Sequence, residues 1–263
     1  MKALWHPFEA SYSGLTSPLI DTHCHYDDER FDPDRDALWQ EAQKAGVVDA
    51  LICSVHPDRF ERTQSVARRL GCHYGLGIHP YFLDTESALN EQIRRLESAI
   101  DNASADPLFV AIGEIGLDGT LVDTPLDAQL PWFEAQLSLA CRYGLPVSLH
   151  AHRAIDLVIA ALRRHRPIAG IVHAFNGSLE QARQLIDLGF KLGFGGVLTN
   201  PGANRIRRVF KELPESAIVL ETDAPDMPGL QRKKSDDTRT HPRDIAYYQS
   251  LALERRTQTP SSD

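Results

Sequence analysis

Short apolar runs alternate with amphipathic stretches along most of the 263-residue chain. Eight runs, rich in β-branched and other apolar residues, have the length of buried strands. They span residues 18–22, 47–55, 72–78, 107–115, 145–149, 168–172, 190–196 and 217–221. The stretches between and after them predict helices over residues 34–45, 58–70, 89–99, 129–143, 154–164, 179–188, 203–212 and 242–255.

The stretch 179–188 shows the helical pattern clearly. Its apolar residues fall near one face, as a helix that covers a sheet requires. Ser178 is the candidate N-cap of this helix, and Gly189 is its candidate C-terminal stop. The turn residues therefore agree with the periodicity about where the helix begins and ends.

Strands that alternate with helices in this way predict parallel βαβ units, and eight of them favour a single (β/α)₈ barrel of the TIM type. An open doubly wound sheet is the alternative. The glycine-rich phosphate loop that usually follows its first strand is absent here. We expect an N-terminal extension over residues 1–17, a barrel domain over residues 18–256 and a disordered tail over residues 257–263.

The formal net charge of −8 argues against a protein that coats duplex nucleic acid, because such proteins need a basic surface. This charge is still compatible with a metal-loaded pocket that holds a short nucleic-acid end. The four cysteines form no CxxC pair and predict free, mostly buried thiols. The chain shows neither a membrane-spanning apolar run nor a signal peptide, so we expect a cytosolic protein without membrane contact.

Histidines and carboxylates recur where the predicted strands end. The C-terminal ends of barrel strands meet at one mouth, which is the face that carries the sites of (β/α)₈ enzymes. Singly, each of these residues has an ordinary structural explanation; together at one mouth they indicate a site for divalent ions such as Zn²⁺, Mn²⁺ or Mg²⁺. The candidate ligands are His23, His25, Glu114, His150, His173 and Asp223.

Six side chains exceed what one tetrahedral ion needs, so we expect two divalent ions. Glu114, from the middle strand in sequence order, is the natural bridge between them. One ion would take His23, His25 and Asp223, and the other would take His150 and His173. The expected nucleophile is a water between the ions, with its pKa lowered towards about 7, and Asp223 is the expected proton acceptor.

Other residues of the same loops are candidates for supporting roles. Asp118 lies within one loop of Glu114 and is expected to orient a ligand by hydrogen bonding. Loops at 113–118, 175–178 and 193–196 offer backbone N–H groups to a phosphate, although tight turns alone explain their glycines equally well. The candidate substrate-binding residues are His79, His152, Asn176 and Ser178.

The chain resembles the TatD-like family of metal-dependent hydrolases, many of which are described as DNases. The resemblance rests on Asp-Thr-His-Cys-His at 21–25, Gly-Ile-His-Pro at 77–80 and Glu-Thr-Asp-Ala-Pro at 221–225. Further matching segments, in family order, lie at 113–118, 146–150 and 170–178. The resemblance implies a (β/α)₈ barrel with a two-metal site, and it assigns the metal ligands to the same six residues. Related amidohydrolases often bridge their metals with a carbamylated lysine, whereas residues 107–118 contain no lysine.

The chain departs from the family pattern at three places. His152 stands where the family usually has an arginine and offers a phosphate a weaker, pH-dependent contact. Asn176 stands where the family often has serine. The chain ends after one helix beyond a basic loop that includes residues 232–234, so we expect the last part of the barrel to be less covered than in relatives.

These observations favour a metal-dependent hydrolase that cleaves phosphodiester bonds at the 3′ end of single-stranded or damaged DNA. One alternative is a hydrolase that acts on a small amide, lactone or phosphoester. The other is a metal-loaded barrel that serves as a binding module and catalyses no reaction. The expected partners are accordingly DNA ends or a small phosphoester, and a monomer is favoured.

Overall fold

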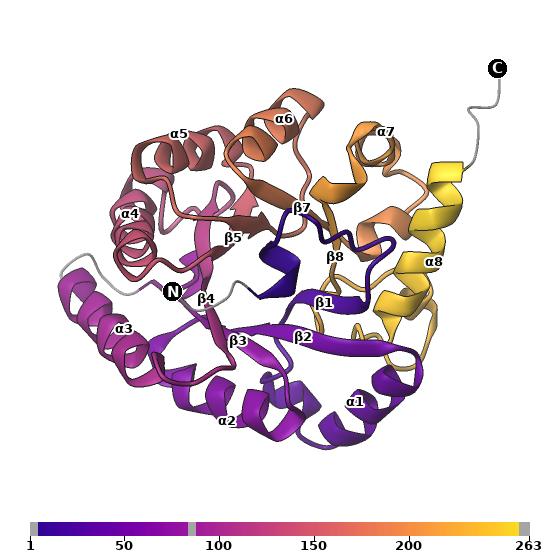
Figure 1. The fold of residues 1–263 in the computed structure, drawn as a ribbon, viewed down its shortest axis with the longest axis horizontal. Helices are drawn as coiled ribbons and strands as arrows, with labels where there is room; N and C mark the ends of the chain where they lie inside the picture. Colours follow the sequence, from indigo (N-terminus) through magenta and orange to yellow (C-terminus); the bar gives the residue numbers. More distant parts are fainter. Residues whose placement is uncertain (1–4, 84–87, 258–263) are drawn as a thin grey trace.

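Eight parallel strands follow one another around the barrel in the order of the sequence (Figure 1). The computed structural model describes residues 5–83 and 88–257. The strands are β1 (Leu19–Cys24), β2 (Val47–Cys53), β3 (His73–Leu76), β4 (Phe109–Asp118), β5 (Val147–His152), β6 (Gly170–Val172), β7 (Phe190–Phe194) and β8 (Ile218–Leu220). The surrounding helices are α1 (Arg35–Lys44), α2 (Phe60–Leu70), α3 (Leu89–Ala103), α4 (Leu126–Tyr143), α5 (Ile155–His165), α6 (Leu179–Asp187), α7 (Asn204–Glu212) and α8 (Asp244–Thr257).

The predicted (β/α)₈ barrel is confirmed, and each predicted strand and helix has a counterpart. Ser178 caps α6 as expected, and its side chain and that of Gln181 form a reciprocal capping box. The expectation that Glu114 ends the fourth strand is wrong, because β4 continues to Asp118. Beyond a register shift between Ile112 and Ile115, β4 keeps pairing with β5 up to the pair Asp118–His152.

Hydrogen bonds close the seam between β8 and β1 at two levels, near the mouth of the barrel and closer to its base. Near the mouth, the backbone N–H of Asp223 donates to the carbonyl of His23 at 3.0 Å, and the Thr22 hydroxyl donates to the carbonyl of Leu220 at 2.9 Å. Lower down, the N–H of Gly14 donates to the carbonyl of Ile218 at 3.0 Å. A Cβ at Gly14 would lie 2.7 Å from the nitrogen of Leu220, so this close approach requires glycine.

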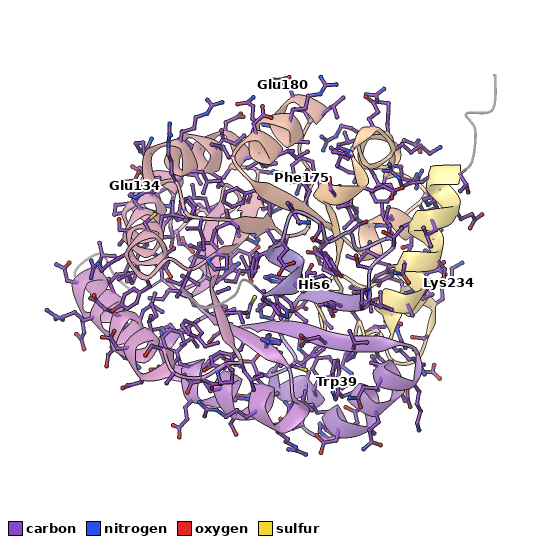
Figure 2. The ribbon with its side chains drawn as sticks, viewed as in Figure 1. His6, Trp39, Glu134, Phe175, Glu180 and Lys234 are labelled. Atoms are coloured by element: carbon purple, nitrogen blue, oxygen red, sulfur yellow. The ribbon has the colours of Figure 1, made fainter. Side chains whose placement is uncertain are left out.

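Residues 5–17 of the N-terminal extension lie across the base of the barrel, where Figure 1 shows them in indigo at the centre. Trp5, Phe8 and Tyr12 are buried there against the lower ends of the strands. The indole N–H of Trp5 donates to the Asp49 carboxylate at 2.9 Å. Figure 2 shows His6, from the same segment, over the centre of the barrel. The described part of the extension therefore belongs to the barrel core.

Helix α8 covers the seam between β8 and β1. Ile245, Tyr248 and Ala252 are buried on its inner face. Thr257, the first residue of the predicted disordered tail, still belongs to α8, and residues 258–263 lie outside the described residues. The expectation that the last part of the barrel is less covered than in relatives stays a prediction.

Two expectations from composition can be followed in the structure. Cys24, Cys53 and Cys72 are buried free thiols, and Cys141 is an exposed one. Within residues 5–83 and 88–257, no helix combines the length and the apolar character needed to cross a bilayer.

Replacing Phe8 with alanine should lower the free energy of unfolding by about 3 kcal/mol, because it opens a cavity among the side chains at the base. Urea unfolding of the variant and the wild type measures this difference. Thr16→Ala, an exposed change in the same segment, should alter the free energy by less than about 0.5 kcal/mol. Equal stability of Phe8→Ala and wild type would show that the extension does not stabilise the barrel.

Lys191 should make stability depend on pH. Its ammonium group is buried on β7, where it donates to the carbonyls of Tyr12 and Ser216, and burial lowers the pKa of Lys191 to about 8. Between this value and the unfolded value near 10.5, the unfolded chain binds more protons, so stability rises with pH. We expect the wild type to gain about 2 kcal/mol relative to Lys191→Met between pH 7 and pH 9.5. A pH-independent difference in urea unfolding would contradict this.

Candidate metal centre

The six candidate ligands converge at the mouth of the barrel, although they come from five strands. His23 and Glu114 lie within β1 and β4, and His150 lies within β5. His25, His173 and Asp223 lie in the loops that follow β1, β6 and β8. All except His23 line one cavity of about 490 Å³, and His23 lies fully buried at its floor.

Glu114 is at the centre of this group, and its two carboxylate oxygens face different sets of ligands. Oε2 lies 3.3 Å from Nε2 of His23 and 3.2 Å from Nε2 of His25. The same two imidazole nitrogens lie 3.6 and 3.5 Å from Oδ1 of Asp223. One side of the carboxylate thus meets three potential ligand atoms from β1 and β8.

The other oxygen of Glu114 faces the ligands from β5 and β6. Oε1 lies 3.2 Å from Nδ1 of His150 and 2.8 Å from Nε2 of His173. These two nitrogens are 3.2 Å apart. A carboxylate placed between two such sets has the arrangement that a bridging ligand requires.

Hydrogen bonds fix the orientation of the two histidines from β1. Nδ1 of His25 donates to the carbonyl of Cys53 at 2.9 Å, which points Nε2 towards Glu114 and Asp223. Nδ1 of His23 lies 2.8 Å from the hydroxyl of Ser148. Burial, followed by the neighbouring charge of His173, lowers the pKa of His23 to about 4, so this imidazole is neutral at pH 7. Imidazoles held in a fixed orientation by hydrogen bonds of this kind are suited to binding a metal ion.

Asp118 orients His150, as expected from the sequence. Its Oδ2 accepts hydrogen bonds from Nε2 of His150 at 2.7 Å and from the hydroxyl of Tyr81 at 3.0 Å. Burial opposes ionisation, yet the hydrogen bonds from His150 and Thr120 hold the pKa of Asp118 well below its usual range. Asp118 therefore stays an acceptor and directs Nδ1 of His150 towards Glu114.

Glu221 lies beside His173 and was not among the predicted site residues. Its Oε1 accepts a hydrogen bond from the N–H of Ala174 at 2.5 Å and lies 3.8 Å from Nδ1 of His173. Burial raises the pKa of Glu221 to about 8. A Cβ at Gly193 would lie 2.0 Å from Oε2 of Glu221, so this glycine makes space for the buried carboxyl group.

Asp21 holds the two ligand-bearing segments of β1 and β8 together. Its carboxylate accepts hydrogen bonds from the backbone N–H and the hydroxyl of Thr222, and from the hydroxyl of Tyr26. The N–H of His25 adds a backbone bond to the carbonyl of Ala224 at 2.8 Å. This local network explains how ligands some 200 positions apart in the sequence reach the same carboxylate.

The donor set fits divalent ions. Nε2 of His23 and Oε1 of Glu114 are buried atoms without a hydrogen-bond partner, and both face the centre of the cluster. Buried polar atoms without partners are costly, and coordination of a cation removes that cost. Histidine nitrogens together with carboxylate oxygens suit first-row divalent metals.

His79 lies at the same carboxylate but is oriented as a donor. Its Nδ1 accepts a hydrogen bond from the N–H of Tyr81 at 3.0 Å, so the neutral ring carries its proton on Nε2. That nitrogen lies 3.3 Å from Oε1 of Glu114. Burial lowers the pKa of His79, which keeps the ring neutral. Its position is therefore suited to donating a hydrogen bond within the cavity.

The other predicted substrate contacts are not all in the same place. His152 and Asn176 line the main cavity, and Nδ1 of His152 lies 3.3 Å from Asp118. Ser178 does not line it; its hydroxyl caps α6 and borders a neighbouring cavity of about 410 Å³. Arg232, from the basic loop, is buried in a two-pronged ion pair with Asp244, and Lys234 lies at the edge of the molecule beside α8 (Figure 2).

Several residues that line the cavity were not found from the sequence. They come from βα loops and have neither a metal-ligand pattern nor a strand-end position that would mark them. Tyr81 and Phe82 directly follow the Gly-Ile-His-Pro segment, which was the one available signal. The residues are Asp27, Asp28, Arg30, Arg59, Tyr81, Phe82 and Met227.

Comparison with known proteins identifies the family. Residues 20–260 match the family described as TatD related DNase. The chain belongs to this family. It is 41% identical over 212 residues to the metal-dependent hydrolase YjjV of Escherichia coli K12, which covers 80% of each chain. The crystal structure of YjjV matches the fold with a TM-score of 0.82, at 34% identity over 91% of each chain.

A second TatD-family relative is described as a 3′-5′ ssDNA/RNA exonuclease, from Erwinia billingiae. It is 30% identical over 212 residues, which cover 79% of each chain. The resemblance inferred from the sequence motifs is thus confirmed, and the chain is a metal-dependent hydrolase of the TatD type.

Removing the carboxylate of Asp118 should weaken metal binding without unfolding the barrel. Asp118→Ala should lower the affinity for Zn²⁺ by about 10- to 100-fold, because His150 loses the group that fixes its tautomer. Asp118→Asn, which keeps an acceptor, should lose less. Calorimetric titration measures both, with Asp123→Ala, an exposed change in the following loop, as the control. An unchanged affinity in Asp118→Ala would contradict the orienting role.

Proposed function

We propose that this TatD-family hydrolase cleaves phosphodiester bonds at the 3′ end of single-stranded DNA, with two divalent ions bound at the mouth of the barrel. The observation that carries the proposal is the placement of Glu114, whose two oxygens face separate sets of ligands. Histidine and carboxylate ligands favour Zn²⁺ or Mn²⁺ and are compatible with Mg²⁺.

Bound ions would supply a water of lowered pKa and would neutralise charge on the phosphodiester. The protein itself would hold the metal ligands in position and accept the proton that the attacking water loses. Asp223 lines the cavity, and its Oδ1 lies 3.5 Å from Nε2 of His25. Burial opposes ionisation, yet the hydrogen bond from His25 and the charge of His173 lower the pKa of Asp223. Asp223 is therefore an anion at neutral pH and can accept the proton that an attacking water loses.

His79 and His152 are the proposed contacts for the substrate phosphate. His79 offers the Nε2 proton described above, from a ring held in place by the N–H of Tyr81. His152 has 41% of its side chain exposed at the rim of the cavity, where an incoming strand would first meet it. A neutral imidazole gives a phosphate a single hydrogen bond, whereas arginine gives two, so this contact is weaker than that of the usual family residue.

The charge of the cavity explains how an acidic protein can receive a polyanion. Five carboxyl groups line it, from Asp27, Asp28, Glu114, Asp223 and Asp226, against the guanidinium groups of Arg30 and Arg59. Two divalent ions would reverse this balance. DNA affinity should therefore require the ions as well as the protein, which differs from the charge-driven binding of basic nucleic-acid proteins.

The relatives support DNA over a small neutral molecule. The name of the Erwinia relative assigns it 3′-5′ cleavage of single-stranded DNA and RNA. A cavity of about 490 Å³ has the size of sites that enclose one small ligand, so it suits a strand end and not a duplex. The cytosolic location and the monomeric state stay predictions.

Metal-stripped protein should shorten a 3′-labelled single-stranded oligonucleotide only after Mg²⁺, Mn²⁺ or Zn²⁺ is restored. Glu114→Ala should reduce the rate to the uncatalysed background while circular dichroism still reports a folded barrel. Glu134→Ala, on the outer surface of α4 (Figure 2), is the matched control and should keep full activity. Undiminished cleavage by Glu114→Ala would overturn the proposal.

The ionic-strength dependence separates the proposal from its alternative. Cleavage of DNA should fall steeply with added salt, because phosphate contacts are screened. Hydrolysis of a neutral amide or lactone should be nearly indifferent to salt. Protein that binds metal but cleaves no DNA with any ion would favour the small-molecule hydrolase.

A further inference from the structure

Large apolar side chains are exposed to solvent inside the cavity above the metal ligands. Tyr81, Phe82 and Met227 line the cavity and are 53%, 46% and 41% exposed. Exposed apolar groups that cluster beside polar ones usually mark a contact with a ligand. The metal ligands and the phosphate contacts do not account for these three side chains.

The apolar groups form two walls that face each other. Tyr81 and Phe82 come from the loop that follows β3. Val197 and Met227 come from the loops that follow β7 and β8. Because the strands run in sequence order around the barrel, β3 lies opposite β7, so these loops rise from opposite sides of the mouth. The result is a slot with apolar sides and the metal ligands at its floor.

The aromatic wall is fixed relative to the ligands. Pro80–Phe82 form a short 3₁₀ turn, and the N–H of Phe82 donates to the carbonyl of His79 at 2.9 Å. The ring of His79 packs edge-on against Tyr81, with 4.6 Å between ring centroids, and lies 6.1 Å from Phe82. The hydroxyl of Tyr81 is tied to Asp118. The rings are thus held in place before a ligand binds.

The opposite wall is fixed as well. Met227 follows Asp226, whose N–H donates to the carbonyl of Asp223 at 2.8 Å. The carboxylate of Asp226 accepts two hydrogen bonds from the guanidinium of Arg30, at 2.8 and 2.9 Å. Each wall is therefore anchored to a residue at the floor of the slot.

We propose that this slot binds the base of the terminal nucleotide, between the ring of Phe82 and the side chain of Met227. The inference rests on the proposed function, which brings a phosphodiester to the metal ligands. The base is the flat, apolar part of the nucleotide attached to that phosphate. Aromatic rings stack on any base, and thioethers contact rings favourably, so the slot selects for the presence of a base and not for its identity.

The test compares two oligonucleotides that differ only at the 3′ end, where one carries a normal nucleotide and the other an abasic residue. The wild type should show a kcat/KM roughly 5- to 100-fold lower on the abasic end, the range expected for one lost stacking contact. Phe82→Ala and Met227→Ala should lose activity on the normal end through a higher KM at similar kcat, and little more on the abasic end. Val122→Ala, which is 90% exposed and outside the cavity, should behave as the wild type.

A binding measurement keeps this test independent of DNA cleavage. Metal-loaded protein is titrated by calorimetry with thymidine 5′-monophosphate and with deoxyribose 5-phosphate. The slot is supported if the wild type binds the nucleotide more tightly than deoxyribose 5-phosphate and Phe82→Ala loses this difference. That result would stand even if the protein cleaves no DNA, because failure to cleave DNA would contradict only the proposed function. Equal affinity for both ligands in wild type and variant, or equal cleavage of both ends, would overturn the slot.

Discussion

The buried carboxylate of Glu114 constrains everything around it. It is only 2% exposed, and an ionised carboxylate in such a place is costly unless it is surrounded by charges or donors. The barrel supplies these from separate strands, since parallel strands in sequence order bring their C-terminal ends to one mouth. The hydrogen bonds that His150 donates to Asp118 and that His25 donates to the carbonyl of Cys53 then turn the imidazoles towards that carboxylate. The metal chemistry of the site therefore depends on the closure of the barrel.

Closure itself is shared between two ends of the molecule. At the mouth, Asp21 joins β1 to the segment after β8 through Thr222, which places His23 and His25 against Asp223. At the base, the N-terminal segment fills the core and completes the lower part of the seam through Gly14. The side chains packed at the base thus lie at the opposite end of the barrel from the candidate metal ligands, so substitutions at the base should spare those ligands.

The sequence allowed the barrel and the ligand cluster to be predicted because both follow from periodicity. A residue at the C-terminal end of a buried strand must lie at the mouth, whatever the loops do, so His150 could be placed. The loops obey no such rule: Phe82 and Met227 were missed, and Ser178 turned out to cap a helix outside the main cavity. Asp223 adopts a positive φ of 57°, which no pattern announced. The packing of the N-terminal extension against the base of the barrel could not be predicted either. Trp5 and Phe8 follow no periodic pattern in the sequence, and only the fold brings them into one cluster.

The two walls of the cavity stand on strands that face each other across the barrel. Their separation is set by the number and tilt of the strands, which fix the diameter of a closed sheet. Substitutions in the loops can change what the walls are made of, but they leave the spacing of the strand ends beneath the walls unchanged. Homologous barrels with the same strand count and tilt thus share the spacing of these strand ends. They can still bind different ligands, because the loops that line the cavity can change.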